Sequence, residues 1–472
     1  MAGRGKRQPA DCRDDIAAAT RVWDRPFRVS LSHDRTRRCP IGGDVAVRGP
    51  LFWFDGDPEQ TGPPVWVSDG VVVCQDGRIV ASGPWTELYQ RIPADAVVHP
   101  YPGHVITAGF VDTHTHYPQT NVMARQADGV TDWLNRHAYA EEARFASPDY
   151  AATGAETFRD EMLRNGTTTA LVFATSHPAS VDAMFAAAAD RNMRIVAGKV
   201  LMDREAPAGL LDTAERGYRE SAALIDRWHG QGRAGYAITP RFAPACSPAA
   251  LDAAATLRRE HPDVLVHTHI AETESEIARV HELFPQHDGY FDVYHHHGLT
   301  GPGTVLAHAV HLTEDEWAAC RDTGTAIAHC PTSNLFLGSG LFDLRTATAH
   351  AVTVGLGTDV GAGTSFSPLV TAGAAHQVAR LRGWTPDPLR LWYLATRGGA
   401  RALRLDDRIG SLAEGHEADL VVLDPKATPA LARRADRAEC LADLLFALAV
   451  LGDDRAVRAT YVAGQRVHHR LP

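Results

Sequence analysis

One pattern dominates the middle of this chain. Short apolar, β-branched runs alternate with longer Ala-, Leu-, Arg- and Glu-rich stretches that have helical periodicity. The eight predicted strands are Val105–His116, Thr168–Thr175, Arg194–Asp203, Gly235–Pro244, Val264–Glu272, Thr304–Val310, Thr325–Asn334 and Val352–Gly361. Eight strand–helix units are the number that closes a (β/α)8 barrel, so the sequence predicts an α/β fold with such a barrel over residues 105–405.

The two ends of the chain have a different texture. Short runs of alternating polarity, separated by Asp-Gly turn signals, occupy residues 41–104, and residues 406–472 have a similar alternation of strands and turns. We expect these two regions to form one small composite β domain beside the barrel. Residues 1–40 are arginine-rich with few apolar runs, and we expect a loosely ordered basic extension there.

Composition excludes several classes of function. The formal net charge of -10 would repel a phosphate backbone, so nucleic acid is not an expected partner. No apolar run is long enough to span a bilayer, and no apolar stretch follows the basic N-terminus, so neither a membrane nor a signal peptide is expected. The 7 cysteines are widely spaced without a CxxC pair, which favours a reducing, cytoplasmic location.

Side chains that bind metals gather at the predicted strand ends. His114 and His116 end the first strand, His269 the fifth, His308 the sixth, and Asp359 the eighth. The active site of such a barrel lies at the C-terminal ends of its strands, and alternate residues of a strand point to the same side. With 24 histidines, a lone one needs no function, but this grouping does not arise readily by chance. Imidazoles, one carboxylate and an open position for water predict a catalytic zinc site.

Glu272 follows His269 by three residues. A metal-dependent hydrolase needs a group beside the metal that moves protons, and a carboxylate can do so. The alternative is an ordinary glutamate in the first turn of the next helix. Its closeness to His269 favours the catalytic interpretation.

Several runs resemble the amidohydrolase superfamily and, within it, the guanine deaminases. The superfamily pattern is carried by HVITAGFVDTHTHYPQTNV, THIAE, AHAVHL and GLGTDVGAGTSF, and HYPQT, PRFAP and SNLFLGSGLF narrow it further. The resemblance runs from about Val65 to the C-terminus, and the first 40 or so residues have no counterpart in it.

The resemblance implies a role for each matching position. One Zn2+ per subunit would have the ligands His114, His116, His269 and Asp359. Glu272 would shuttle protons, and Asp359 would also accept the proton of the water. His308 would hold the attacking hydroxide by a hydrogen bond, or join the metal loosely.

The implied reaction is hydrolytic deamination of guanine to xanthine and ammonia in purine catabolism, by a homodimer. The expected substrate contacts are His116, Gln119, Arg241, Phe242, His269, Glu272 and Asp359. The amide of Gln119 both donates and accepts, the Arg241 guanidinium suits a purine carbonyl, and Phe242 can pack on the ring. Taken alone, Gln119 fits a polar loop residue and Arg241 a structural ion pair; the metal motif favours substrate binding.

Three other interpretations stay open. The same metal site would serve a deaminase of 8-oxoguanine, a pterin or an aminotriazine, or a triazine halide hydrolase. A binuclear hydantoinase-like enzyme needs a carboxylated lysine at the end of the fourth strand, where this chain has Arg241; Lys199 lies on the third strand and is expected to be structural. A non-catalytic scaffold should have lost at least one ligand, and none is missing.

Overall fold

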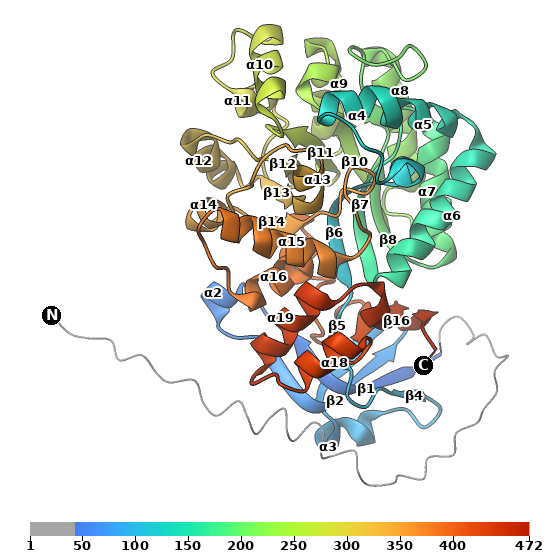
Figure 1. Cartoon of the computed structure of the whole chain (residues 1–472). Helices are drawn as coiled ribbons and strands as arrows, with labels where there is room; N and C mark the ends of the chain where they lie inside the picture. The colour runs from blue at the N-terminus through green and yellow to red at the C-terminus, as the bar shows by residue number, and fades with distance from the viewer. Residues whose placement is uncertain (1–42, 472) are drawn as a thin grey trace.

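Two sheets organise the computed structural model, which describes residues 43–471 (Figure 1). The expected extension at residues 1–40 lies outside the described residues. The larger sheet is parallel and follows chain order: β6 Phe110–His116, β7 Thr167–Phe173, β8 Arg194–Gly198, β10 Ala234–Pro240, β11 Leu265–Ile270, β12 Thr304–His308, β13 Ala326–His329 and β14 Val354–Leu356, with the short β9 Val200–Leu201 beside β10.

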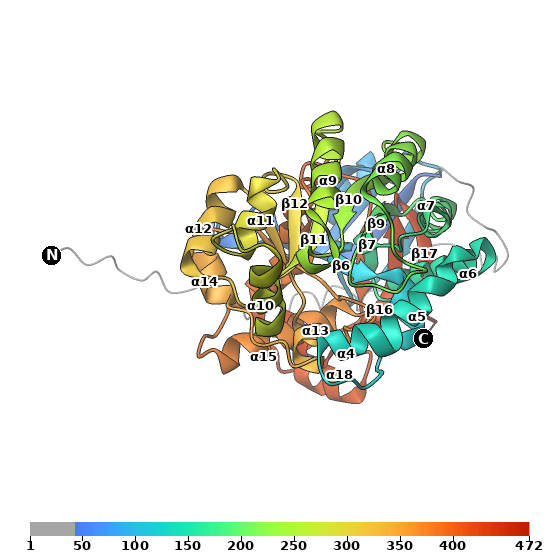
Figure 2. The ribbon, with the colours of Figure 1, turned by 90° about the horizontal axis from the view of Figure 1, so that it is seen from above.

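This parallel sheet curls into a nearly closed barrel, seen from above in Figure 2. Hydrogen bonds join the first strand to the chain after the last one. The backbone N–H of Asp359 donates to the carbonyl of His114 at 2.9 Å, and that of His116 donates to Val360 at 2.8 Å. The predicted (β/α)8 barrel is therefore confirmed.

Helices follow the strands and pack around the barrel. They are α6 Pro148–Arg164, α7 Pro178–Asp190, α8 Ala214–Trp228, α9 Pro248–Glu260, α10 Glu274–Leu283, α11 Tyr290–His296, α12 Glu314–Thr323, α13 Pro331–Phe336, α14 Leu344–Ala349, α15 Pro368–Leu381, α16 Pro388–Ala395 and α17 Arg397–Ala402. Local sequence sets their ends: α12 begins with a capping box between Thr313 and Glu316 and ends at Gly324 in the left-handed conformation. No helix in the described part of the chain is long and apolar enough to cross a membrane.

The smaller sheet is built from both ends of the described chain. Its order is β17-β16-β15-β5-β1-β2-β3, with β4 beside β1. The strands are β1 Val45–Trp53, β2 Val65–Gln75, β3 Arg78–Pro84, β4 Val97–Pro100, β5 Val105–Ala108, β15 Leu420–Leu423, β16 Val457–Val462 and β17 Gln465–His469. Two helices, α18 Pro429–Ala435 and α19 Leu441–Leu451, lie between β15 and β16 in sequence, and Trp392 of α16 donates to the Leu445 carbonyl of α19 at 2.9 Å. The expected sheet from both chain ends is confirmed.

The predicted first barrel strand, residues 105–116, is wrong in one respect. It consists of two strands in two sheets: β5 pairs antiparallel with β15, and β6 pairs parallel with β7. The chain passes between the sheets at Gly109, where a Cβ atom would lie only 2.1 Å from the hydroxyl of Thr168. The small sheet thus extends to Ala108, beyond the boundary predicted at residue 104. Because the apolar run continues through the junction, periodicity could not reveal the break.

Buried charges connect the N-terminal ends of two barrel strands to the small sheet. Arg194 of β8 donates through Nε to Glu417 at 2.9 Å, and Arg233, just before β10, donates through Nε to the same oxygen at 2.9 Å. Arg233 also donates through Nη1 to Asp419 at 3.0 Å. Burial favours the neutral acid of Glu417, but the Arg194 hydrogen bond and the Arg233 charge outweigh it and lower its pKa.

Replacing Glu417 by Gln should lower the free energy of unfolding at pH 7 by about 3 kcal/mol, because two buried guanidinium groups lose their shared carboxylate. Folding lowers the pKa of Glu417, so its contribution to stability is complete above the unfolded value, near 4.5, and is lost as pH falls from there through the lower folded value. Urea unfolding at pH 7 and at steps below pH 4.5 should therefore show the stability of the parent falling towards that of the variant. The exposed pair of Glu414 with Arg91 supplies the control: Glu414→Gln should change stability by less than about 0.5 kcal/mol. A pH-independent difference would contradict the ionic explanation.

Candidate active site

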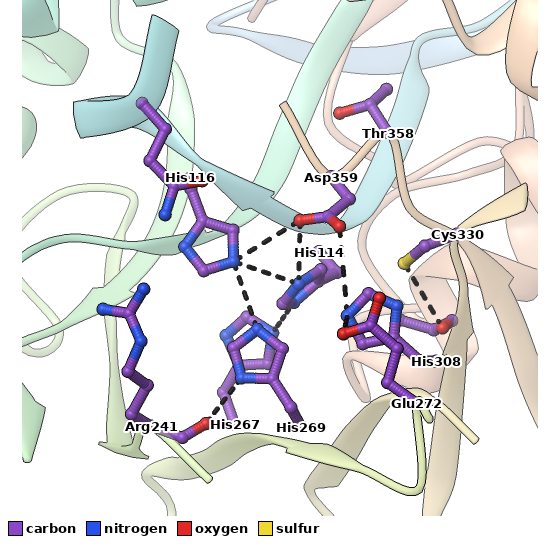
Figure 3. Close-up of polar contacts among 12 residues, drawn as sticks. His114, His116, Arg241, His267, His269, Glu272, His308, Cys330, Thr358 and Asp359 are labelled. Carbon is purple, nitrogen blue, oxygen red and sulfur yellow. Dashed lines mark hydrogen bonds and ion pairs between the residues drawn. The ribbon is translucent and has the colours of Figure 1, made fainter. Parts of the chain in front are cut away.

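Four potential metal-ligand atoms converge at the C-terminal end of the barrel (Figure 3). The Nε2 atom of His116 lies 3.2 Å from Nε2 of His114 and 3.2 Å from Nε2 of His269. The Oδ1 atom of Asp359 lies 3.2 Å from Nε2 of His114 and 3.4 Å from Nε2 of His116. The structure thus brings together the four side chains predicted as ligands, from β6, from β11 and from the turn after β14.

The spacing and protonation of these atoms fit a metal ion. Bonds of about 2.0–2.1 Å in a tetrahedral zinc site place ligand atoms roughly 3.3 Å apart. Burial lowers the pKa values of His116 and His269 well below their usual range, so both imidazoles are neutral. Nδ1 of His269 meets the carbonyl of Arg241 at 2.5 Å and must donate to it, which leaves a lone pair on Nε2. Lone pairs that face one another repel unless a cation lies between them.

A second histidine of β11, His267, contacts one of these side chains. Nε2 of the buried His267 lies 2.8 Å from Nδ1 of His114. Such outer contacts fix the ring orientation and tautomer of a metal ligand. Sequence reasoning missed His267, although His267-Thr268-His269 repeats the alternation of His114-Thr115-His116 and was therefore a usable signal.

His308 lies next to the group, with a ligand atom within 4.8 Å of those of His114 and Asp359. Its Nε2 atom is 3.6 Å from Oε2 of Glu272 and 3.9 Å from Oδ2 of Asp359, and its Nδ1 atom contacts the Asn334 amide at 3.0 Å. Burial lowers the pKa of His308 to about 3, so the ring is neutral. His308 (φ 73°) and Asp359 (φ 48°) both have left-handed backbone, a strained conformation that concentrates at functional sites.

Glu272 is a buried carboxylic acid beside the four atoms. Ser339 donates to its Oε1 at 2.8 Å, and the amide of Asn334 approaches the same oxygen at 3.5 Å. Burial, reinforced by the charge of Asp359, raises the pKa of Glu272 well above its usual range. A carboxyl group whose proton affinity is raised in this way can act as a general base and then as a general acid. Asn334 and Ser339, which sequence reasoning did not single out, both lie in the SNLFLGSGLF run.

A cavity of about 330 Å³ opens over this group. It falls within the range of small-molecule sites, about 300–1,000 Å³. Of the site residues predicted from sequence, His114 is absent from its lining; the others line it, namely His116, Gln119, Arg241, Phe242, His269, Glu272, His308 and Asp359. Part of the cavity wall comes from the segment after β6, through Trp133, Leu134 and Tyr139. This segment forms the short helices α4 Val130–Trp133, η4 Leu134–Ala138 and α5 Tyr139–Glu142.

Two further side chains bear on the predictions. Sequence reasoning missed Glu142, which is buried behind Gln119 and Arg241 and binds both.

Lys199 pairs with Asp212 and is absent from the cavity lining, in agreement with a structural lysine. Arg241 directly follows β10, the fourth barrel strand, so the lysine that a hydantoinase-like centre needs is absent from that position.

A (β/α)8 barrel whose mouth holds four histidines, an aspartate and a buried glutamate is the arrangement of the metal-dependent amidohydrolases. Residues 105–467 match the Amidohydrolase family, and the chain belongs to that family. It is 49% identical over 429 residues to the guanine deaminase of Escherichia coli (strain K12), a match that covers 90% of this chain and 98% of that protein. The solved structure of E. coli guanine deaminase superposes with a TM-score of 0.88.

Two other solved structures share the architecture. A guanine deaminase from C. acetobutylicum, with guanine bound in its active site, is 26% identical with a TM-score of 0.82 and covers 90% of this chain and 100% of its own. An adenosine deaminase from Xanthomonas campestris with bound zinc is 25% identical with a TM-score of 0.79, covering 91% of this chain and 93% of its own.

Proposed function

We propose that this chain is an enzyme that hydrolyses guanine to xanthine and ammonia, with one zinc ion per subunit. The observation that carries the proposal is a single small cavity in which Gln119, Arg241 and Phe242 share the walls with the converging metal-ligand atoms. The identity with guanine deaminases over nearly the whole described chain supports the choice of substrate.

The proposed metal ligands are His114, His116, His269 and Asp359. A zinc ion held there would supply a water nucleophile that is activated near neutral pH. The zinc-bound relative from X. campestris supports this choice of metal.

Protons move through two carboxyl groups. Glu272 takes one proton from the attacking water and delivers it to ring N3 of guanine, which makes C2 electrophilic. As the water oxygen bonds to C2, its second proton passes to Asp359. That proton moves on through Glu272 to the amino group, and the C2–N bond breaks to release ammonia. The burial that raises the pKa of Glu272 makes this carboxylate a stronger base, so that it binds each proton before delivering it.

The remaining residues hold the ring and the water. Gln119 and Arg241 orient the ring so that C2 faces the attacking water, and Phe242 packs against its face. The neutral ring of His308, next to Glu272 and Asp359, is placed to hold the water by a hydrogen bond. Holding both reactants in one geometry removes much of the entropic barrier of a bimolecular reaction.

A substrate panel tests the proposal directly. Ammonia release by the zinc-loaded protein should be fast with guanine, with xanthine as the product, and slow with 8-oxoguanine, adenine, cytosine, a pterin and an aminotriazine. If another member of the panel released ammonia faster, that compound would replace guanine as the proposed substrate. The proposed metal site would not be affected by this result. No release from any member would refute the assignment.

Replacing Arg241 by Ala should raise KM for guanine by about 10–100-fold, since a charged hydrogen-bond donor to the ring is lost. The metal content should stay at the parent level, because His269 contacts the backbone carbonyl of Arg241, which the substitution keeps. Arg227→Ala, which removes an exposed arginine paired with Asp182, is the matched control and should leave KM unchanged. An unaltered KM in Arg241→Ala would remove this residue from substrate binding.

The proposal extends to a cytoplasmic homodimer that acts in purine catabolism. Leu335 of α13 and Val450 of α19 are exposed apolar side chains that line one hollow, which supports a subunit contact at that face. Sedimentation equilibrium should give twice the chain mass of 51.1 kDa, and the monomer mass would contradict the dimer.

A further inference from the structure

Glu142, at the end of α5, is a buried carboxylate that binds two residues of the cavity wall. It accepts a hydrogen bond from Nε2 of Gln119 at 2.6 Å. Nη1 and Nη2 of Arg241 donate to its two oxygens at 2.6 and 2.9 Å. Glu142 is 1% exposed, and Gln119 and Arg241 are 2% exposed each. Glu142 itself does not line the cavity, so it acts through the other two side chains.

The contact with Glu142 decides which end of the Gln119 amide is free. A carboxylate only accepts hydrogen bonds, so the end of the amide that meets Glu142 is the NH2 group. The carbonyl oxygen Oε1 is the end left for a ligand in the cavity. Without Glu142, the amide could turn over and present NH2 instead.

The same carboxylate fixes the charge and plane of Arg241. Burial alone would lower the pKa of this guanidinium, but Glu142 outweighs that effect and keeps the group charged. The two parallel hydrogen bonds hold the guanidinium plane, and its remaining N–H groups stay available as donors. The cavity wall therefore presents one acceptor, from Gln119, beside donors from Arg241.

We propose that Glu142 is a positioning residue that sets the substrate specificity of the cavity, by holding Gln119 as an acceptor and Arg241 as a donor. This pattern complements a lactam edge, in which a ring N–H lies beside a carbonyl, as N1–H and O6 do in guanine. It opposes an amidine edge, in which a ring nitrogen accepts and an exocyclic amine donates. The inference rests on the proposed function and adds the residue that determines which edge of a purine ring the cavity binds.

The test compares guanine with 2,6-diaminopurine, which carries the same leaving amino group at C2 but the reversed edge. Glu142→Gln keeps the side-chain size and replaces the carboxylate by an amide, which places an NH2 group against donors of Arg241 or Gln119. The ratio of kcat/KM for guanine to that for 2,6-diaminopurine should fall by about 10–100-fold. The KM for guanine should rise more than kcat falls, and the metal content should stay at the parent level.

Glu141 offers a matched control on the same helix. It is also buried, but it binds Asn121, Tyr150 and Arg144 and does not line the cavity. Glu141→Gln should keep the parent selectivity ratio. If the role of Glu142 were purely structural, Glu142→Gln would lower the folded fraction of the enzyme. The activity on both substrates would then fall equally, and the ratio of their kcat/KM values would stay unchanged.

Three outcomes separate the claims. A parent that releases no ammonia from guanine refutes the proposed function, and this inference with it. If the parent is active, and the Glu142→Gln variant is folded, metal-loaded and equally selective, only the role of Glu142 is refuted. If Glu142→Gln does not fold, Glu142→Asp keeps the charge but is too short to reach both partners; it should lose about tenfold in selectivity, and parent selectivity in that variant would overturn the inference.

Discussion

Replacing Glu272 by Gln should lower kcat for guanine by about 10²–10⁴-fold, with the metal content unchanged. The amide keeps the shape and can still accept from Ser339, but it cannot carry a proton to the ring or to the departing amine. Glu272 is absent from the proposed ligand set, so metal binding should survive. Steady-state kinetics with xanthine detection and metal analysis of the same sample would measure both effects.

Glu274, two residues further along and exposed, provides the control for this experiment. Glu274→Gln should retain the parent kcat and metal content. Turnover of guanine at the parent rate by Glu272→Gln would exclude Glu272 as the proton carrier. Loss of metal together with activity would instead place Glu272 among the metal ligands.

Replacing His269 by Ala should abolish measurable metal binding and lower kcat/KM for guanine by more than about 10³-fold. The reason is the water: its pKa is 15.7 in bulk and about 7 at a catalytic zinc site, so loss of the ion removes most of the nucleophile at neutral pH. The substitution also removes one of the neutral imidazoles that now face one another. Metal content by mass spectrometry is the primary measurement, with activity second.

His281→Ala, on the exposed side of α10, is the control and should bind metal like the parent. Full metal occupancy in His269→Ala would show that the remaining ligands suffice. Full activity without metal would contradict the proposed chemistry as a whole.

The barrel and its converging side chains could be predicted because both follow from simple periodicities. Alternation of two along a strand places His114 and His116 on one side, and parallel strands bring their C-terminal ends to one mouth. His269 and Asp359 are at strand ends in the sequence, and the structure brings them to the same point. The resemblance of the motif runs added the roles, which periodicity cannot supply.

Residues outside the strands were harder to predict. Glu142 lies in the segment of short helices between β6 and β7, where no periodic pattern sets the path of the chain. Nothing in the sequence distinguishes it from its neighbour Glu141, which faces different partners. The break at Gly109 was invisible for a related reason: β5 and β6 are both buried, so the apolar pattern is continuous although the sheets differ.

The composite small sheet has a consequence for how this chain is made. Strand β5 needs β15 as its antiparallel neighbour, but β15 leaves the ribosome about 300 residues later, roughly 15 to 60 s at common rates of synthesis. During that interval an apolar edge made early in translation has no partner. Nascent chains should therefore depend on chaperones until the last strands leave the ribosome. A premature stop codon before β15 should yield aggregates rather than a shorter, active barrel.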